Sequence, residues 1–316
     1  MAYFKKVHPF LQVLVFIGLA FGMFLIIGTV GTMILASVTG KSLAYIDDVK
    51  NWDMKDPATL LIVRGQLIIQ FLSFFVIPSF LFARFCDRQP GQWLGLKPAH
   101  LIYYALGAII LIAALPLVNW TGIINHKLIP ETTAIGKWMK EAEELGARQV
   151  EFLLTRNNIT DLLLNLLFVA VFAGIGEELF FRGVLQRLFI KLFRNAWAGI
   201  LLAAFVFSAF HFQFYGFIPR FILGILLGLI YWYSGSLWPA IVAHFVYDAF
   251  AVIMVYFYPD MAKQENATLS MGNQLVMAVL STVVVVGIVI MMKRRSTTTY
   301  EAMYARDRID DSNPFA

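Results

Sequence analysis

Long apolar runs separated by short polar stretches dominate the chain. A membrane-spanning helix needs about 20 predominantly apolar residues, and by that measure we count eight spans. The pattern therefore predicts an all-α, polytopic membrane protein with about eight transmembrane helices. The first run is too long for the core of a signal peptide, so we expect it to be retained. The predicted spans are approximately residues 9–39, 60–85, 102–118, 160–193, 196–214, 219–233, 237–258 and 275–292.

The polar stretches between the spans are short, with one exception. Residues 120–159 contain the segment IGKWMKEAEELGARQVEFLL, whose apolar positions recur at helical spacing among charged ones. This pattern is typical of an amphipathic helix on the protein surface or at the membrane boundary. The polar residues after 295 show no such periodicity, and we expect a loose tail there.

Composition agrees with a membrane setting. Hydrophobic residues make up 59% of the chain and charged residues only 14%, against about 25% charged residues in soluble domains. The single cysteine, Cys86, excludes an internal disulfide framework. The net charge of +5 is modest, and in a membrane protein it indicates basic cytoplasmic loops rather than a nucleic-acid partner.

The distribution of basic residues predicts the orientation. Short loops that face the cytoplasm carry an excess of Lys and Arg. With a cytoplasmic N-terminus, the inner segments carry basic clusters, whereas the outer loops mix basic residues with several Asp and Glu. We therefore expect both termini on the cytoplasmic side. The inner basic residues are Lys5, Lys6, Arg84, Arg88, Lys97, Arg187, Lys191, Arg194, Lys293, Arg294 and Arg295.

Ionisable residues inside the predicted spans are few. Charged groups are expensive in the hydrocarbon layer and indicate a functional site unless shown otherwise. Arg64 lies near the start of the second span, from which its long side chain could reach the interface. The others fall in three places, which hold Glu177, Glu178 and Arg182, then His211, then His244 and Asp248.

Spacing predicts how these places meet. Glu177 and His211 each lie 17 residues from Arg194, where the chain is expected to turn between two antiparallel helices. Both helices rise by about 1.5 Å per residue, so the two side chains should reach the same depth. His244 and Asp248, four residues apart, share one helix face. Their estimated depth is shallower than that of Glu177.

The two adjacent glutamates differ in their partners. Glu178 lies four residues before Arg182, which is the favourable order for an ion pair on one helix. Glu177 is rotated by about 100° from that face. It is left free for chemistry, and a buried carboxylate with His211 opposite could take a proton from water.

Three motifs resemble those of one known family. The segments are EELFFR (177–182), FSAFH (207–211) and HFVYD (244–248). In this order they are similar to the E-E-x-x-x-R, F-x-x-x-H and H-x-x-x-N or H-x-x-x-D motifs of the CAAX protease and bacteriocin-processing family of intramembrane peptidases. The prenyl-protein endopeptidases of that family have eight spans, as counted here independently.

The resemblance implies a function and a division of the chain. It implies a glutamic-type intramembrane endopeptidase that needs no cofactor and no metal. The substrate would be a membrane-associated peptide or protein, possibly lipidated. Residues 1–159 would form three N-terminal spans with a long external loop, and 160–258 the catalytic core. The final span (259–295) and a polar cytoplasmic tail (296–316) would follow.

The resemblance also implies residue roles. Glu177 would activate the hydrolytic water with help from His211, while His244 and Asp248 would stabilise the oxyanion. Glu178 and Arg182 would support the motif. Asp248 departs from an asparagine pattern, because an aspartate donates a hydrogen bond only when it is protonated. It either acts as a neutral donor, which the family's acceptance of Asn favours, or orients His244 as an anion.

Other interpretations stay open at this point. Glu177, His211 and His244 match the ligands of some catalytic zinc sites, although the helical H-E-x-x-H signature is absent. A proton-coupled or small-solute transporter would also need buried carboxylates and histidines. Against it, we find neither paired repeats nor two matching interrupted helices. The third alternative is a non-catalytic membrane scaffold or immunity protein that keeps the motifs for packing.

Overall fold

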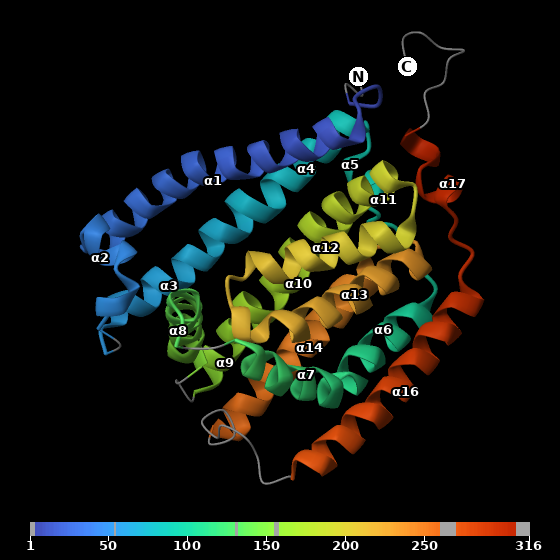
Figure 1. Cartoon of the computed structure of the whole chain (residues 1–316). Coiled ribbons are helices and arrows are strands. Elements are labelled where there is room, and N and C mark those ends of the chain that lie inside the picture. The colour runs from blue at the N-terminus through green and yellow to red at the C-terminus, as the bar shows by residue number, and fades with distance from the viewer. Residues whose placement is uncertain (1–3, 54, 130–131, 155–157, 260–269, 308–316) are drawn as a thin grey trace.

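The computed structural model describes residues 4–53, 55–129, 132–154, 158–259 and 270–307. Within these ranges the regular structure is helical throughout, and the helices form one bundle (Figure 1). The chain is a multi-pass, all-α membrane protein. Its helices are α1 (Pro9–Thr39), α2 (Leu43–Asp47), α3 (Pro57–Gln70), α4 (Ile77–Cys86), α5 (Pro90–Trp93), α6 (Leu101–Ala113), α7 (Leu115–Leu128), α8 (Ala134–Leu154), α9 (Ile159–Asn165), α10 (Phe172–Glu177), α11 (Arg187–Phe193), α12 (Ala196–Phe210), α13 (Phe217–Ser234), α14 (Trp238–Phe257), α16 (Met271–Arg295) and α17 (Tyr300–Met303).

All eight predicted spans are found as apolar helices. Six helices in the described ranges are long and apolar enough to cross a membrane, and a bent pair makes a seventh. That pair is α6 and α7, which meet at an angle of 41°. Pro116, near the start of α7, explains the bend, because a proline lacks the N–H that would continue the helix. The eighth is the shorter helix α12, which ends at Phe210 rather than near residue 214 as predicted.

The fourth span is one continuous helix with two changes of winding. It runs from Ile159 to Phe193 and contains the π-helical segments Leu166–Val171 and Glu178–Gln186. In a π-helix each N–H bonds to the carbonyl five residues earlier, so more residues occupy each turn. All nine residues of the second segment are buried. A change of winding alters which side chains share a face, and a 3.6-residue period does not reveal it.

A tight hairpin joins this span to α12. Arg194 adopts left-handed backbone geometry with φ of 50°, and Asn195 caps α12 by accepting a hydrogen bond from the Ala198 N–H at 3.1 Å. Just beyond the turn, Gly199 packs against the backbone of α11. A Cβ at this position would lie 2.6 Å from the Ile190 nitrogen, so the two helices can approach this closely only with glycine.

The predicted amphipathic helix is present as α8 and is anchored on the bundle. Phe152 and Leu153 near its C-terminal end are buried, and the Leu153 carbonyl accepts a hydrogen bond from the Asn165 side chain at 2.6 Å. Glu143 accepts a hydrogen bond from the Tyr215 N–H at 3.1 Å. Figure 1 shows α8 end-on beside α3 and α9, so its axis runs across theirs. One face of α8 therefore contributes to the interior.

Arg64 forms an ion pair that the sequence did not predict. Its Nη2 lies 2.5 Å from Oδ1 of Asp161, at the start of the fourth span. Both side chains are largely buried, with 14% and 9% of their surface exposed. The pair joins α3 to α9, and a partner 97 residues away cannot be read from local sequence.

The expectation of a loose tail is wrong for its described part. Beyond α16 the chain folds back, and Met303 and Tyr304 are buried. Asp307 Oδ1 accepts hydrogen bonds from Arg187 Nη2 at 2.9 Å and from Trp93 Nε1 at 3.0 Å. Burial alone would raise the pKa of Asp307, but the charges of Arg187 and Lys191 outweigh it and lower that pKa. We call this docked segment, residues 300–307, the C-terminal clasp.

The clasp defines one end of the bundle. Arg306 Nη2 pairs with Asp87 Oδ1 at 3.0 Å, close to where the Phe4 N–H donates to the Phe85 carbonyl at 3.2 Å. The first and last described residues therefore lie at the same end. Because the basic clusters after α4, α11 and α16 also lie here, we call it the basic end.

Candidate active site

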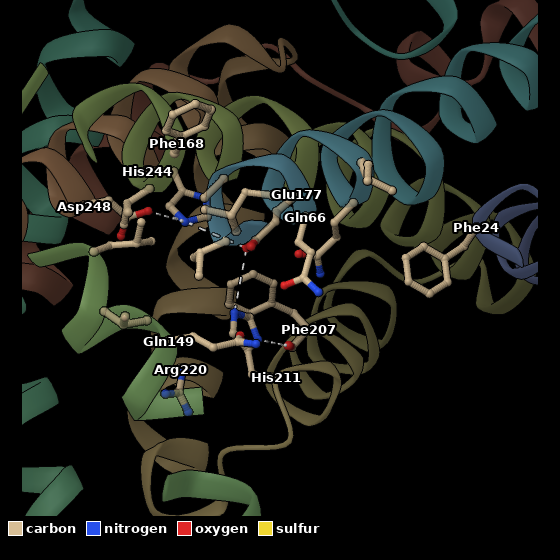
Figure 2. Close-up of a pocket in the computed structure, with 18 of the residues that line it drawn as sticks. Phe24, Gln66, Gln149, Phe168, Glu177, Phe207, His211, Arg220, His244 and Asp248 are labelled. Carbon is tan, nitrogen blue, oxygen red and sulfur yellow. Dashed lines mark hydrogen bonds and ion pairs between the residues drawn. The ribbon is translucent and has the colours of Figure 1, made fainter. Parts of the chain in front are cut away.

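The three polar places in the sequence meet around one cavity inside the bundle. Glu177 ends α10, His211 directly follows α12, and His244 and Asp248 lie on α14. All four line a cavity of about 980 Å³. Figure 2 shows the Glu177 carboxylate between the imidazole rings of His211 and His244. The fold thus brings together all of the polar residues singled out in the fourth, fifth and seventh spans.

Glu177 faces two imidazole nitrogens at nearly equal distance. Its Oε2 lies 3.9 Å from His211 Nε2 and 4.0 Å from His244 Nε2. Both separations exceed that of a direct hydrogen bond, and they are of the size that one bridging water spans. The side chain keeps 16% of its surface exposed. The predicted approach of Glu177 and His211 is confirmed.

The orientation of His211 fixes which of its nitrogens faces Glu177. Nδ1 lies 2.8 Å from the Phe207 carbonyl oxygen. A carbonyl only accepts, so Nδ1 carries the proton in this bond. In the neutral ring Nε2 then has a free lone pair, which points toward Glu177 (Figure 2). His211 can therefore accept a hydrogen bond from a water held at the carboxylate.

Glu178 links Arg182 to His244. Its Oε1 accepts a hydrogen bond from Arg182 Nη1 at 2.6 Å and lies 2.9 Å from His244 Nδ1. The predicted ion pair between Glu178 and Arg182 is confirmed, and the two side chains are 0% and 1% exposed. Arg182 also donates to the Gly224 carbonyl at 3.2 Å and stacks on the Phe207 ring. The bond to His244 was not predicted.

His244 has a carboxylate at each ring nitrogen. Nδ1 faces Glu178, and Nε2 lies 3.3 Å from Asp248 Oδ2. His244 and Glu177 do meet, with polar atoms 4.0 Å apart, although equal depth was not expected from the residue count. The π-helical segment Glu178–Gln186 lies between Glu177 and the turn at Arg194, so the helix is not uniformly wound over the residues from which the depth was counted.

The cavity extends beyond the polar cluster and has residues that the sequence did not single out. It continues between α1 and α3, where Phe24 and Gln66 line it, to Gln149 on α8. Arg220, near the start of α13, also lines it and donates to the Gln213 carbonyl at 2.8 Å. The sequence could have indicated Arg220, because it is a charged residue within the predicted sixth span. It could not have indicated Gln149, because the amphipathic pattern of α8 does not show what covers its apolar face.

The geometry also bears on the metal interpretation. Of the three candidate ligands, Glu177 has its Oε2 3.9 Å from His211 Nε2 and 4.0 Å from His244 Nε2. Within the described ranges, no three His, Cys, Asp or Glu side chains form a group that could hold a metal ion. That the site works without a metal stays a prediction for experiment.

Comparison with known proteins points to one family. Residues 159–250 match the family model described as Type II CAAX prenyl endopeptidase Rce1-like, which confirms the family resemblance of the three motifs. The chain is also 31% identical over 97 residues to the uncharacterized protein YpbD of Bacillus subtilis (strain 168). That similarity covers 29% of this chain and 47%, about half, of YpbD. No solved structure matches significantly.

Proposed function

Starting from the match of residues 159–250 to the Rce1-like endopeptidase family, we propose that this protein hydrolyses a peptide bond at the membrane with a water activated by Glu177 and His211. The observation that carries the proposal is the position of Glu177 Oε2, about equally far from two imidazole nitrogens. Its setting is a cavity within a bundle of membrane-spanning helices.

The hydrolytic step follows from these atoms. A water bound at Glu177 Oε2 gives one hydrogen to the carboxylate and points the other toward His211 Nε2. As its oxygen attacks the peptide carbonyl carbon, Glu177 takes the proton as general base. When the tetrahedral intermediate collapses, the C–N bond breaks and Glu177 returns that proton to the leaving amine. One water is consumed, and a carboxylic acid and an amine are formed.

His244 and Asp248 stabilise the charge that develops on the substrate oxygen. Because Nδ1 of His244 donates to Glu178, its Nε2 is the ring atom that faces the reacting groups. In this proposal one proton is shared between Nε2 and Asp248 Oδ2, which are 3.3 Å apart. That proton is available to the oxyanion, and such preorganised donors are often the largest single contribution to catalysis. Glu178 and Arg182 act indirectly, by fixing the His244 ring.

The shape of the cavity fits a substrate drawn from the membrane. The cavity runs from Glu177 to the lipid-exposed helix α1 and to α8, and most of its lining beyond the polar cluster is apolar. We propose that a membrane-associated peptide, possibly lipidated, lies along it with its scissile bond at Glu177. In this proposal the basic end faces the cytoplasm, as its excess of Lys and Arg indicates.

The test is hydrolysis of a labelled peptide library, with and without lipid attachment, by the full-length protein in detergent. Glu177→Gln and His211→Ala should each reduce the cleavage rate by about 10²–10⁴, the usual contribution of acid–base catalysis. Glu301→Gln, at an exposed glutamate of the clasp, is the matched control and should leave the rate unchanged. Near-normal cleavage by either site variant would refute the assignment.

A chelation arm separates the glutamate mechanism from zinc chemistry. If Glu177 and His211 alone activate the water, thorough treatment with a chelator should leave cleavage intact. Elemental analysis of the active protein should then find no stoichiometric zinc. Loss of cleavage on chelation, with recovery on addition of Zn²⁺, would show instead that Glu177, His211 and His244 are metal ligands.

A further inference from the structure

A second cavity lies at the basic end, away from Glu177. Its volume is about 550 Å³, within the usual range for small-molecule sites. It is enclosed where α6 begins, where α13 ends and where the chain leaves α16 toward the clasp. We call it the basic pocket. Its lining residues are Lys97, Pro98, Ala99, His100, Ile102, Tyr103, Tyr233, Ser234, Gly235, Arg295, Thr297, Thr298, Ala302 and Met303.

The charges around the basic pocket are of one sign. Lys97, His100 and Arg295 line it, and none of its lining residues is acidic. Lys97 and Arg295 are exposed, and neither has a described carboxylate within ion-pair distance. His100 Nδ1 accepts a hydrogen bond from the Ile102 N–H at 3.3 Å, which leaves its Nε2 free to donate when the ring is neutral. The pocket therefore offers convergent donors to an anion.

The pocket lies at the ends of three apolar helices, where spans are expected to meet the membrane surface. Leu101 begins α6, Ser234 ends α13 and Arg295 ends α16, and each is the boundary of an apolar helix. Ile102 and Tyr103 of α6 and Met303 of the clasp add apolar surface to the lining. Cationic groups at the rim with apolar groups below match the phosphate and the glycerol region of a phospholipid. Basic pockets between transmembrane helices are known to bind anionic lipid headgroups.

Specific backbone and side-chain contacts fix the walls of the pocket. Gly235 turns the chain at φ of 64°, and a Cβ there would lie 2.8 Å from Thr298 Oγ1. The Ser236 hydroxyl donates to the Lys97 carbonyl at 2.5 Å, which fixes the backbone beside that lysine. The clasp holds the remaining wall, because Tyr231 OH contacts Met303 Sδ at 3.8 Å. The cationic rim is therefore presented by a fixed backbone.

We propose that the basic pocket binds the phosphate of one anionic phospholipid from the leaflet at the basic end. The proposal does not depend on peptide hydrolysis, because none of the pocket residues belongs to the cluster around Glu177. Lys97 and Arg295 supply the charge, and His100 with the nearby hydroxyls supplies further donors.

The test measures lipid binding by the full-length protein. Phosphatidylglycerol and phosphatidylcholine are titrated separately into protein in neutral detergent, and bound lipids are counted by native mass spectrometry. The parent should retain one phosphatidylglycerol more tightly than any phosphatidylcholine. Replacing both charges, as Lys97→Gln with Arg295→Gln, should weaken that binding on the order of thirtyfold, from the typical contribution of two basic residues at a membrane surface.

The matched control removes the same charge from the same end. Lys293→Gln with Arg294→Gln changes two exposed basic residues that do not line the pocket, and binding should stay within about threefold of the parent. Equal weakening by both double variants would show only general charge attraction and would overturn the pocket. Equal retention of the two lipids by the parent would do the same. Full displacement of the lipid by inorganic phosphate would assign the pocket to a soluble anion.

Discussion

Breaking the buried ion pair of Glu178 and Arg182 should destabilise the whole bundle. The two side chains are 0% and 1% exposed, and their closest atoms are 2.6 Å apart. Solvent therefore screens neither charge. Arg182→Leu leaves Glu178 with the His244 ring as its remaining partner among the described residues. An uncompensated buried charge of this kind costs about 3–5 kcal/mol, which corresponds to a fall in the melting temperature on the order of 10 °C.

Two comparison variants test whether the loss of stability in Arg182→Leu comes from the unpaired charge. The double change Glu178→Leu with Arg182→Leu removes both ions, and apolar replacement of a buried pair is often nearly neutral. It should recover most of the lost stability while abolishing cleavage, because His244 loses the acceptor of its Nδ1 proton. Glu177→Gln should change stability by less than about 1 kcal/mol, because that carboxylate is partly exposed and its histidine neighbours lie at 3.9 and 4.0 Å, beyond hydrogen-bond distance.

The assay is thermal unfolding in one detergent at one heating rate, since membrane proteins often unfold irreversibly and rate-dependently. The parent, Glu177→Gln and the double variant should have similar melting temperatures, and Arg182→Leu should melt well below all three. A melting temperature of Arg182→Leu equal to that of the parent would refute the argument. So would an equal loss in Glu177→Gln, because the two glutamates would then not differ in role.

Two further predictions concern pH. Asp248→Asn replaces a titrating donor by an amide that does not titrate, so it should keep cleavage activity and flatten the alkaline limb of the pH–rate profile. Activity impaired at every pH would show instead that Asp248 works as an anion that orients His244. Asp307→Asn should lower stability at neutral pH by on the order of 2 kcal/mol, since a hydrogen-bonded charge is lost. Because the pKa of Asp307 is lowered in the folded protein, the parent's advantage exists above the unfolded-state pKa, about 3.9. It should disappear as the pH falls below that value, and a pH-independent difference in chemical denaturation would contradict this.

Much of the architecture could be predicted because it rests on local patterns. Apolar runs gave the positions of all eight helical regions, and two residues at a spacing of four gave the ion pair of Glu178 with Arg182. The proximity of Glu177 and His211 was predicted because each lies 17 residues from the turn at Arg194. Each of these depends on residues within one helix or one hairpin.

The rest depends on long-range packing. The fourth span is π-helical at Glu178–Gln186, and a 3.6-residue count does not predict which of these side chains faces α14, where His244 lies 2.9 Å from Glu178. The ion pair of Arg64 with Asp161 spans 97 residues. The clasp was predicted to be a loose polar tail because the partners of Asp307, which include Arg187 and Trp93, lie more than 100 residues earlier in the chain. Periodic patterns in the sequence do not predict partners that lie so far apart in the chain.

The clasp also sets the order in which the protein is completed during synthesis. Arg187 is only 3% exposed, and its described carboxylate partner, Asp307, lies 120 residues later in the chain. The spans between them leave the ribosome first, so the helix that bears Glu177 enters the membrane before the counter-charge at its basic end exists. A chain cut short between Arg295 and Asp307 by a premature stop codon would retain every span yet leave that arginine uncompensated. Such a chain should insert normally and then be recognised as incomplete by the proteases that survey newly made membrane proteins.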